Sequence, residues 1–386
     1  MSRRAADRSD TVRGAAGVGL YVHLPFCASR CAYCTFVTST ETALMPRTIG
    51  AVASEIRRLS PRCGLPLASL YLGGGTPSLV APDDLAGVFS AVRSAFRLLP
   101  DAEVTLEANP DDVTREKVRA WRSLGVNRIS LGIQALQERI LTMLNRRHSA
   151  AQGRDAASIV HDEGLVLSVD LMLGLPGLTA ADVETNVNDM LAVEPHHVSV
   201  YLLEMDKPHR LVALAARRPD LFPDEDAAAG QYLAAGRRLT AAGYRHYEIS
   251  NFARPGFAAR HNTRYWRGQT VLAAGVAAHG QAGRRRWANV ADLGEYLRRA
   301  DAGESAVDWS KRLEPDDALR ERTMVGLRLA AGVPAVDLDR CGRLSPPFRS
   351  RLEDFLELGL ARRRGERIRL SPRGWLLSNE LLATLW

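Results

Sequence analysis

The stretch YVHLPFCASRCAYCTF, residues 21–36, decides how this chain of 386 residues is interpreted. Its three cysteines, Cys27, Cys31 and Cys34, follow a short apolar segment in a C-x3-C-x2-C spacing. Thiolates on one tight loop can bind three irons of a [4Fe–4S] cluster, which normally has four cysteine ligands. Phe36 stands where a C-x-C continuation would place a fourth cysteine. The spacing therefore predicts a cluster with one iron open to an exogenous ligand.

A structural zinc site is the alternative for the same cysteines. Zinc in a closed site takes four ligands, usually from two separated pairs. The loop offers one trio without a second pair, and His23 on the preceding segment could serve as the fourth ligand. The spacing favours the iron–sulfur cluster and leaves zinc open.

Composition indicates a globular protein with one large domain and a smaller one, since 46% of residues are apolar and 25% are charged. No apolar run approaches the roughly 20 residues of a membrane helix, and the N-terminal segment lacks the apolar core of a secretory signal. Cys63 and Cys341 stand alone, so a disulfide framework is not expected. These features, with the thiolate loop, predict a reducing cytoplasmic location.

The formal charge of +7 is weak evidence for a nucleic-acid partner. Only three basic residues are lysines, and this arginine dominance is typical of a GC-rich coding bias. The basic residues are interleaved with acids along the chain, which argues against one binding stripe. We therefore expect no nucleic-acid binding.

Strand-like and helix-like segments alternate from residue 19 to about 203. The strand-like segments are 19–24, 69–72, 103–107, 128–132, 167–173 and 198–203, and the helix-like segments include 47–59, 82–96, 114–124, 136–144 and 181–191. Such repeated units predict a parallel sheet with right-handed crossovers. Six units predict an α/β fold with a partial (β/α)6 TIM-like barrel, whose active site gathers at the C-terminal ends of its strands.

The rest of the chain divides into a motif-bearing extension and a second unit. We expect a disordered lead-in over 1–18, the barrel over 19–205, the extension over 206–312 and a mainly helical unit over 313–386. Helix-like segments at 313–331, 348–360 and 375–385 surround a short strand at 367–370, and this pattern resembles a winged-helix fold. The arginines at 362–364 are more simply a solvated charge run than a DNA-binding surface.

Short motifs follow several of the expected strands. They are LGGGTP at 72–77, EANP at 107–110, SLGIQ at 130–134, an arginine at 146 and DLMLGLPG at 170–177. Glycines let the backbone approach a ligand closely. Each motif alone has an ordinary alternative as a turn, a helix cap or a surface residue. Together with the cysteine loop they predict one cavity whose carboxylates, arginine and amides suit a zwitterionic ligand.

The cysteine loop and these motifs resemble the radical S-adenosylmethionine (radical SAM) superfamily, and the GGGTP form resembles the oxygen-independent coproporphyrinogen dehydrogenases and their haem-chaperone relatives. The resemblance implies that Cys27, Cys31 and Cys34 bind the cluster and that SAM caps the open iron. It further implies that SAM is contacted by Tyr21, Tyr33, Gly74, Gly75, Thr76, Glu107, Gln134, Arg146 and Asp170. In this family an electron from the cluster cleaves SAM to a 5′-deoxyadenosyl radical, and the protein binds and orients the cofactors.

The segment HNTRYW at 261–266, preceded by YEISNF at 247–252, resembles the HNxxYW signature of the HemW group of haem chaperones. Histidine is a common axial ligand of haem iron, and aromatic rings offer flat faces to a macrocycle. The resemblance therefore implies haem binding by His261, Tyr265 and Trp266. The ordinary alternative is a buried histidine beside packed aromatic side chains.

The chain departs from the HemW pattern at three places. Thr35 replaces the usual Asp after the third cysteine, GVAAHG at 275–280 replaces the usual GPGAHS, and DKPH at 206–209 replaces an acidic loop with Gly-Thr. A diverged member of the group could hold another ligand in its cavity.

We predict a haem chaperone that binds a SAM-capped [4Fe–4S] cluster and one haem, and delivers the haem to an acceptor protein. The alternative is a radical SAM enzyme, either a coproporphyrinogen dehydrogenase or a HemN-like methyltransferase. Phe36 and the short segment before the first strand argue against the dehydrogenase. A DNA-responsive regulator is a second alternative. The resemblance also implies an electron donor such as flavodoxin or ferredoxin, and it allows membrane-surface association and a haem-linked homodimer.

Overall fold

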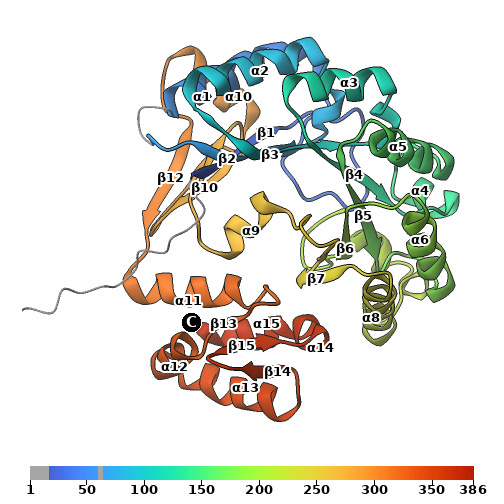
Figure 1. Cartoon of the computed structure of the whole chain (residues 1–386), viewed down its shortest axis with the longest axis vertical. Coiled ribbons are helices and arrows are strands. Elements are labelled where there is room, and N and C mark those ends of the chain that lie inside the picture. Colours follow the sequence, from blue (N-terminus) through green and yellow to red (C-terminus); the bar gives the residue numbers. More distant parts are fainter. Residues whose placement is uncertain (1–16, 60–63) are drawn as a thin grey trace, which may run out of the picture.

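In a computed structural model, described for residues 17–59 and 64–386, a 12-stranded sheet wrapped by helices stands above a smaller C-terminal unit (Figure 1). The strand order in the large sheet is β12-β11-β10-β9-β1-β2-β3-β4-β5-β6-β8-β7. Its parallel centre runs in chain order through β1 Val18–Leu24, β2 Leu67–Gly74, β3 Leu98–Ala108, β4 Arg128–Gln134, β5 Val166–Leu173 and β6 His197–Leu202. Most of the expected lead-in, as well as Cys63, lies outside the described residues.

The helices that connect these strands complete the predicted partial barrel. They are α1 Met45–Leu59, α2 Pro82–Ala95, α3 Arg115–Leu124, α4 Glu138–Met143, α5 Ala150–Asp162 and α6 Ala180–Ala192. Local sequence explains several helix starts, because Ser149 and Thr179 form capping boxes that satisfy the first N–H groups of α5 and α6. The strands are buried on both faces, as expected for a parallel sheet covered by helices. The α/β fold with a (β/α)6 barrel is therefore confirmed.

The extension contains more strand than its sequence pattern indicated. Its elements are α7 Arg210–Ala215, α8 Glu225–Ala241, β7 Arg245–Glu248, β8 Asn251–Ala253, α9 Arg260–Trp266, β9 Val271–Ala274, β10 His279–Ala282, β11 Arg285–Asn289, α10 Leu293–Asp301 and β12 Val307–Arg312. Strands of three to six residues are too short to show a clear alternating pattern. β9 pairs parallel with β1, and the other strands extend the two edges of the sheet with antiparallel pairs.

The C-terminal unit has its own apolar core and the winged-helix order of elements. These are α11 Pro315–Gly326, β13 Val333–Pro334, α12 Ala335–Leu344, α13 Pro346–Glu357, β14 Ala361–Arg364 and β15 Arg367–Leu370, followed by α14 Pro372–Leu376 and α15 Ser378–Leu382. The sequence indicated β15 but not the two-residue β13 or the arginine-rich β14. The unit is tied to the barrel by backbone hydrogen bonds of 2.9 Å from Ile249 N to Arg328 O and from Ala330 N to Tyr247 O.

The helix α9 lies between the two wings of the open sheet, above α11 (Figure 1). Glu103, near the start of the buried part of β3, accepts hydrogen bonds from the first N–H groups of α9, at Arg260 (3.0 Å) and His261 (2.8 Å). This carboxylate holds the HNxxYW segment against the barrel. Within the described residues no helix is both long and apolar enough to span a membrane.

Candidate functional site

The cysteine loop leaves the C-terminal end of β1 and is closed on itself. Cys27 N donates to Ser39 O (3.0 Å), and Ser39 N donates to Pro25 O (2.8 Å). Gly75 lies beneath the loop so closely that a Cβ there would stand 2.6 Å from Phe26 O. The glycine motif after β2 therefore supports the loop through its lack of a side chain.

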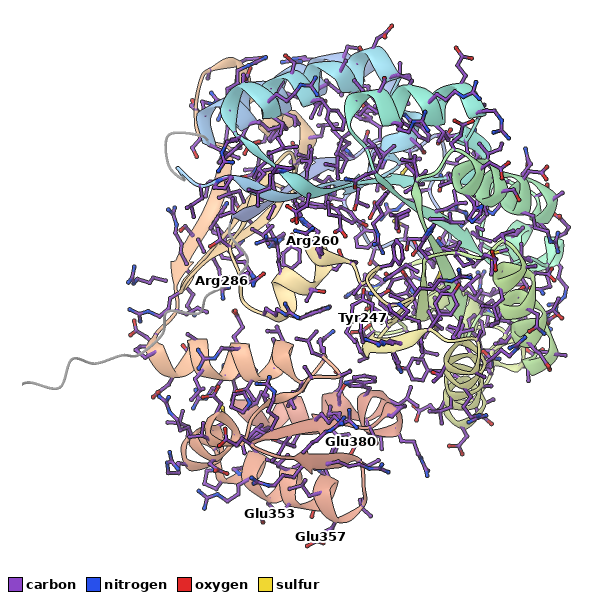
Figure 2. All side chains as sticks on the ribbon, in the orientation of Figure 1. Tyr247, Arg260, Arg286, Glu353, Glu357 and Glu380 are labelled. Atoms are coloured by element: carbon purple, nitrogen blue, oxygen red, sulfur yellow. The ribbon has the colours of Figure 1, made fainter. Side chains whose placement is uncertain are left out.

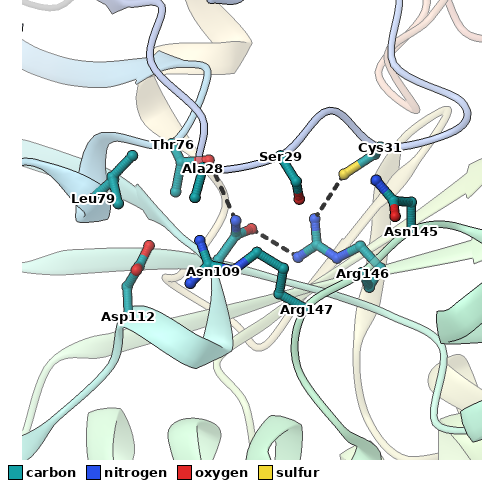
Figure 3. Close-up of a pocket in the computed structure, with 10 residues that line it drawn as sticks. All are labelled: Ala28, Ser29, Cys31, Thr76, Leu79, Asn109, Asp112, Asn145, Arg146 and Arg147. Atoms are coloured by element: carbon teal, nitrogen blue, oxygen red, sulfur yellow. Dashed lines mark hydrogen bonds between the residues drawn. The ribbon is translucent and has the colours of Figure 1, made fainter. Parts of the chain in front are cut away.

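Two polar side chains lie close to cysteine sulfurs, and Figure 3 shows one of them, Arg146 beside Cys31. Thr76 Oγ1 lies 3.5 Å from Cys27 Sγ, and Arg146 Nη1 lies 3.3 Å from Cys31 Sγ. Arg146 Nη2 also donates to Asn109 Oδ1 (2.7 Å) and Gly132 O (2.6 Å). The guanidinium thus joins the cysteine loop to the ends of β3 and β4.

The donor set fits an iron–sulfur cluster better than zinc. Within the described residues, no three His, Cys, Asp or Glu side chains are grouped to hold one metal ion, whereas a cubane takes each thiolate at a different iron. His23, the fourth zinc ligand considered above, has both ring nitrogens engaged by Tyr21 Oη and Val37 O, each at 3.0 Å. Burial raises the pKa of Cys27 to about 11 and also raises that of Cys34, so a metal is needed to ionise these thiols. A bound cluster would supply one-electron chemistry at this loop.

Glu107 presents a carboxylate at the end of β3. It accepts hydrogen bonds from Tyr71 Oη (2.7 Å) and from Gly74 N (3.0 Å). Burial raises its pKa to about 7, against the opposing effect of the Tyr71 hydrogen bond, and the nearby Asp170 carboxylate raises it further. Because the N–H groups of Gly74 and Gly75 are bonded to Glu107 and Leu24, the backbone can offer a ligand only carbonyl oxygens here.

The next two strands bring further predicted contacts to the same end of the barrel. Gln134 has φ +68° at a register shift of β4, a backbone conformation unusual for a residue with a side chain. Ser130 Oγ donates to Asp170 Oδ2 at 3.2 Å, and burial raises the pKa of Asp170. Tyr33 is close to Cys31, and burial raises the pKa of its hydroxyl. The carboxylates, the arginine and the glycine motif therefore lie, with the cysteine loop, at the edge of the sheet where its parallel strands end.

The HNxxYW helix places its histidine elsewhere, in the barrel interior. His261 is only 1% exposed, and its Nδ1 lies 3.0 Å from Ser69 Oγ. Its ring packs against Tyr71 (centroids 5.2 Å apart) and Tyr265 (5.6 Å). Nε2 is buried and has no hydrogen-bond partner in the part of the chain that the structure describes. Burial together with Arg264 lowers the pKa of His261 to about 3. The imidazole is neutral, with one nitrogen fixed and the other free.

A cavity of about 480 Å³ lies beside α9. Tyr265 and Trp266 line it, while His261 does not. Another residue of α9 and residues of β6, β7, β8, the β7–β8 turn, β10, β11 and α11 form the remaining wall. They are Tyr201, Glu248, Ser250, Asn251, Asn262, Gln281, Arg286, Glu321, Met324 and Val325. This volume falls in the range of small-molecule and cofactor sites.

Comparison with known proteins identifies the family. The radical SAM superfamily model matches residues 21–190, and the HemN C-terminal domain model matches residues 313–377. Heme chaperone HemW of Mycobacterium tuberculosis is 36% identical over 378 residues, covering 95% of this chain and 94% of the relative. The HemW protein of Bacillus subtilis is 30% identical over 94% of this chain and 97% of its own length. The chain belongs to the HemW family of radical SAM proteins.

A solved structure supports the fold of this HemW family member. Coproporphyrinogen III oxidase (HemN) from Escherichia coli superposes with a TM-score of 0.81, covering 96% of this chain and 90% of that chain. The sequence identity is 21%, so the likeness concerns the fold alone.

The sequence interpretation missed several residues at both ends of the site. Asn109 lies within the EANP motif but was not expected to bind Arg146. Tyr71 precedes the glycine motif and was not singled out, although it bonds Glu107 and packs on His261. Glu248, which lines the cavity, lies in the YEISNF segment, but the sequence interpretation assigned it no role. An acidic residue inside an otherwise apolar and amide-bearing segment was the signal that could have indicated it.

Proposed function

We propose that this protein is a haem chaperone, which binds a SAM-capped [4Fe–4S] cluster at its cysteine loop and a haem beside α9, and transfers the haem to an acceptor protein. Family membership supports the cluster and SAM, since radical SAM proteins share these cofactors. The observation that carries the haem assignment is the cavity of about 480 Å³ lined by Tyr265 and Trp266 of the HNxxYW helix. Flat aromatic faces beside an open volume suit a macrocycle.

The state of His261 suits an axial ligand of haem iron. Metal-binding histidines are neutral and have their second nitrogen oriented by a hydrogen bond. His261 meets both conditions through its lowered pKa and its contact with Ser69, while Nε2 has no partner. Because the ring lies behind Tyr265, ligation requires Tyr265 to move aside. Tyr265 is therefore proposed as the residue that separates the resting histidine from bound haem.

The test is a haem titration of anaerobically reconstituted protein, followed by the Soret band. Saturation near one haem per chain is expected in the wild type, with a shifted band and weaker binding in His261→Ala. A matched control is His209→Ala, since His209 is outside the cavity and bonds the backbone carbonyl of Glu204. A non-saturating titration that is the same in all three proteins would contradict the proposal.

The acceptor and the reductant complete the proposed cycle. We propose a small electron-carrier protein, a flavodoxin or a ferredoxin, as the donor that keeps the cluster reducible. Release of 5′-deoxyadenosine that rises with a porphyrinogen but not with haem would instead favour a radical enzyme.

Membrane-surface association and haem-linked dimerisation are further proposals. Vesicle flotation would test the first, and light scattering with and without haem would test the second.

A further inference from the structure

Three polar side chains with buried atoms that lack a well-formed hydrogen bond within the described residues share the wall of the cavity beside α9. Glu248 is 1% exposed and Asn251 is 4% exposed, and both line the cavity. Among the residues that the structure describes, no well-formed hydrogen bond reaches either carboxylate oxygen of Glu248, Asn251 Oδ1 or Trp266 Nε1. Buried polar atoms are nearly always bonded, so a group of four such atoms around one cavity requires an explanation.

The Glu248 carboxylate is buried among groups that act on its pKa in opposite directions. Burial raises its pKa to about 7, while the backbone of Ser250, the Asn251 and Trp266 side chains and the charge of Arg328 act in the opposite direction. The backbone of Ser250 and the side chains of Asn251 and Trp266 approach the carboxylate closely enough to lower its pKa, but none of them makes a well-formed hydrogen bond with it. Groups that share its electrostatic environment are Tyr201 on β6, Tyr232 on α8, Tyr247 on β7 and Arg328 after α11.

Two arginines lie near this part of the cavity, Arg286 beside a carboxylate and Arg328 beside an aromatic ring. At the wall of the cavity, Arg286 Nε donates to Glu321 Oε1 at 2.9 Å, so the charge of Arg286 is compensated. The Arg328 guanidinium lies over the ring of Trp266, 5.2 Å from its centroid. The side of the cavity formed by Trp266 therefore combines a nearby cation with an N–H donor that lacks a well-formed hydrogen bond within the described residues, an arrangement that attracts an anion.

We propose that Glu248, Asn251 and Trp266 form a binding site for one carboxyl group of the ligand in this cavity. Trp266 Nε1 donates to the ligand carboxylate. Glu248 in its protonated form donates its own proton to the same group, and Asn251 accepts when that proton moves to the ligand. No bond to carbon forms or breaks, and the shared proton returns to Glu248 when the ligand leaves as a carboxylate. The inference rests on the proposed function, in which the ligand is a haem with its propionates.

An amine would be a poorer occupant of this site. It would pair with ionised Glu248, but it would be repelled by Arg328 and would leave Trp266 Nε1 without an acceptor. A carboxyl group satisfies the donor and the acid together. The site also makes binding dependent on pH, because ionised Glu248 repels a ligand carboxylate. His261, whose pKa is about 3, stays neutral over the relevant range and does not contribute.

The experiment compares iron protoporphyrin IX with its dimethyl ester, which lacks free carboxylates, at pH 6.0 and pH 8.5. In wild-type protein, haem is expected to bind about tenfold or more tightly at pH 6.0, since Glu248 ionises with a pKa of about 7 and each pH unit above it corresponds to a factor of ten. The ester is expected to bind more weakly than haem at pH 6.0, with little change at pH 8.5. Glu248→Gln, which keeps a donor but cannot ionise, is expected to bind haem equally at both pH values.

Glu353→Gln is the matched control. Glu353 is exposed on α13, at the side of the C-terminal unit away from Tyr247 and Arg286 (Figure 2). Glu353→Gln should bind haem with the same pH dependence as the wild type. Equal pH dependence in wild type and Glu248→Gln, or equal binding of haem and ester by the wild type, would overturn the carboxyl site while leaving haem binding intact. Absence of saturable binding in every protein would instead overturn the proposed function. The ester comparison requires no substitution, so it decides the question even if Glu248→Gln does not fold.

Discussion

Glu107 is the residue at which protonation should control the cysteine end of the barrel. Its folded pKa of about 7 means that it is largely neutral at pH 6 and ionised at pH 8. We propose that the ammonium group of SAM pairs with the ionised carboxylate. SAM affinity should therefore rise as pH increases from 6.0 to 7.5, by several-fold, because each unit below the pKa costs a factor of ten in the charged form.

Anaerobic equilibrium dialysis of reconstituted protein with SAM measures this dependence. Glu107→Gln should bind SAM more weakly and with a flat pH profile, and Glu116→Gln, at the start of α3, provides a control with the same chemical change. A rise of equal steepness in Glu107→Gln would assign the titration to another group.

Sequence reasoning located most individual residues of the cysteine end, because each motif directly follows a strand and parallel strands end at a common edge. It could not locate the partners that arise from packing. The hydrogen bond from Tyr71 to Glu107 and that from Arg146 to Asn109 join residues 36 and 37 positions apart. Such contacts depend on strand register, which no local pattern records.

At the scale of elements, the turn between β9 and β10 shows how one departure from the family pattern is accommodated. Gly275 has φ +100°, and a Cβ there would overlap His23 O, so only glycine fits at this position. Gly280 is also required, because a Cβ would overlap the ring of Trp287. Ala277 occupies a position where the HemW pattern has glycine, and its φ is +54°. An alanine in this left-handed conformation stores strain that glycine would not.

Ala277→Gly should therefore stabilise the protein, by about 0.5–1 kcal/mol after the greater flexibility of glycine in the unfolded chain is included. The free energy of unfolding from guanidinium titration is the measurement. Ala278→Gly is the control, since Ala278 is fully buried and is not among the residues with positive φ. It should destabilise the protein. Destabilisation by both substitutions would show that the backbone at Ala277 carries no relievable strain.

The length of a strand explains which strands the sequence could not predict. The six long strands of the barrel have apolar runs that identify them, whereas β7, β8, β9 and β10 have three or four residues each. β8 and β9 pair with β6 and β1, which are distant in sequence, and β7 and β10 then pair with β8 and β9. The position of α9 was equally hidden. Its place between the wings of the sheet depends on Glu103 of β3, which lies more than 150 residues earlier in the sequence.

At the scale of the whole molecule, the cysteine loop and the cavity belong to different ends of the fold. The loop is held by β1, β2 and Arg146, whereas the cavity takes one wall from α11 in the C-terminal unit. Within the described residues, the aromatic rings of Tyr21, Tyr71 and His261 lie between them, with neighbouring centroids 5.2–6.5 Å apart. This packing joins the two ends mechanically without sharing a ligand-binding residue.

Binding at the two ends should therefore be separable by substitution. Met324→Glu places a charge in the wall of the cavity near Glu248 and Glu321, and it should weaken haem binding by about tenfold or more, because an unpaired buried charge costs at least 1–2 kcal/mol. Iron and sulfide content and SAM affinity should stay at wild-type levels. Cys31→Ser should do the reverse, since it removes a thiolate that Arg146 contacts and leaves the cavity intact. Both ligands would be measured in both variants by Soret titration and by iron analysis. Loss of the cluster in Met324→Glu would mean that the C-terminal unit, through α11 and α9, also determines the geometry of the cysteine loop.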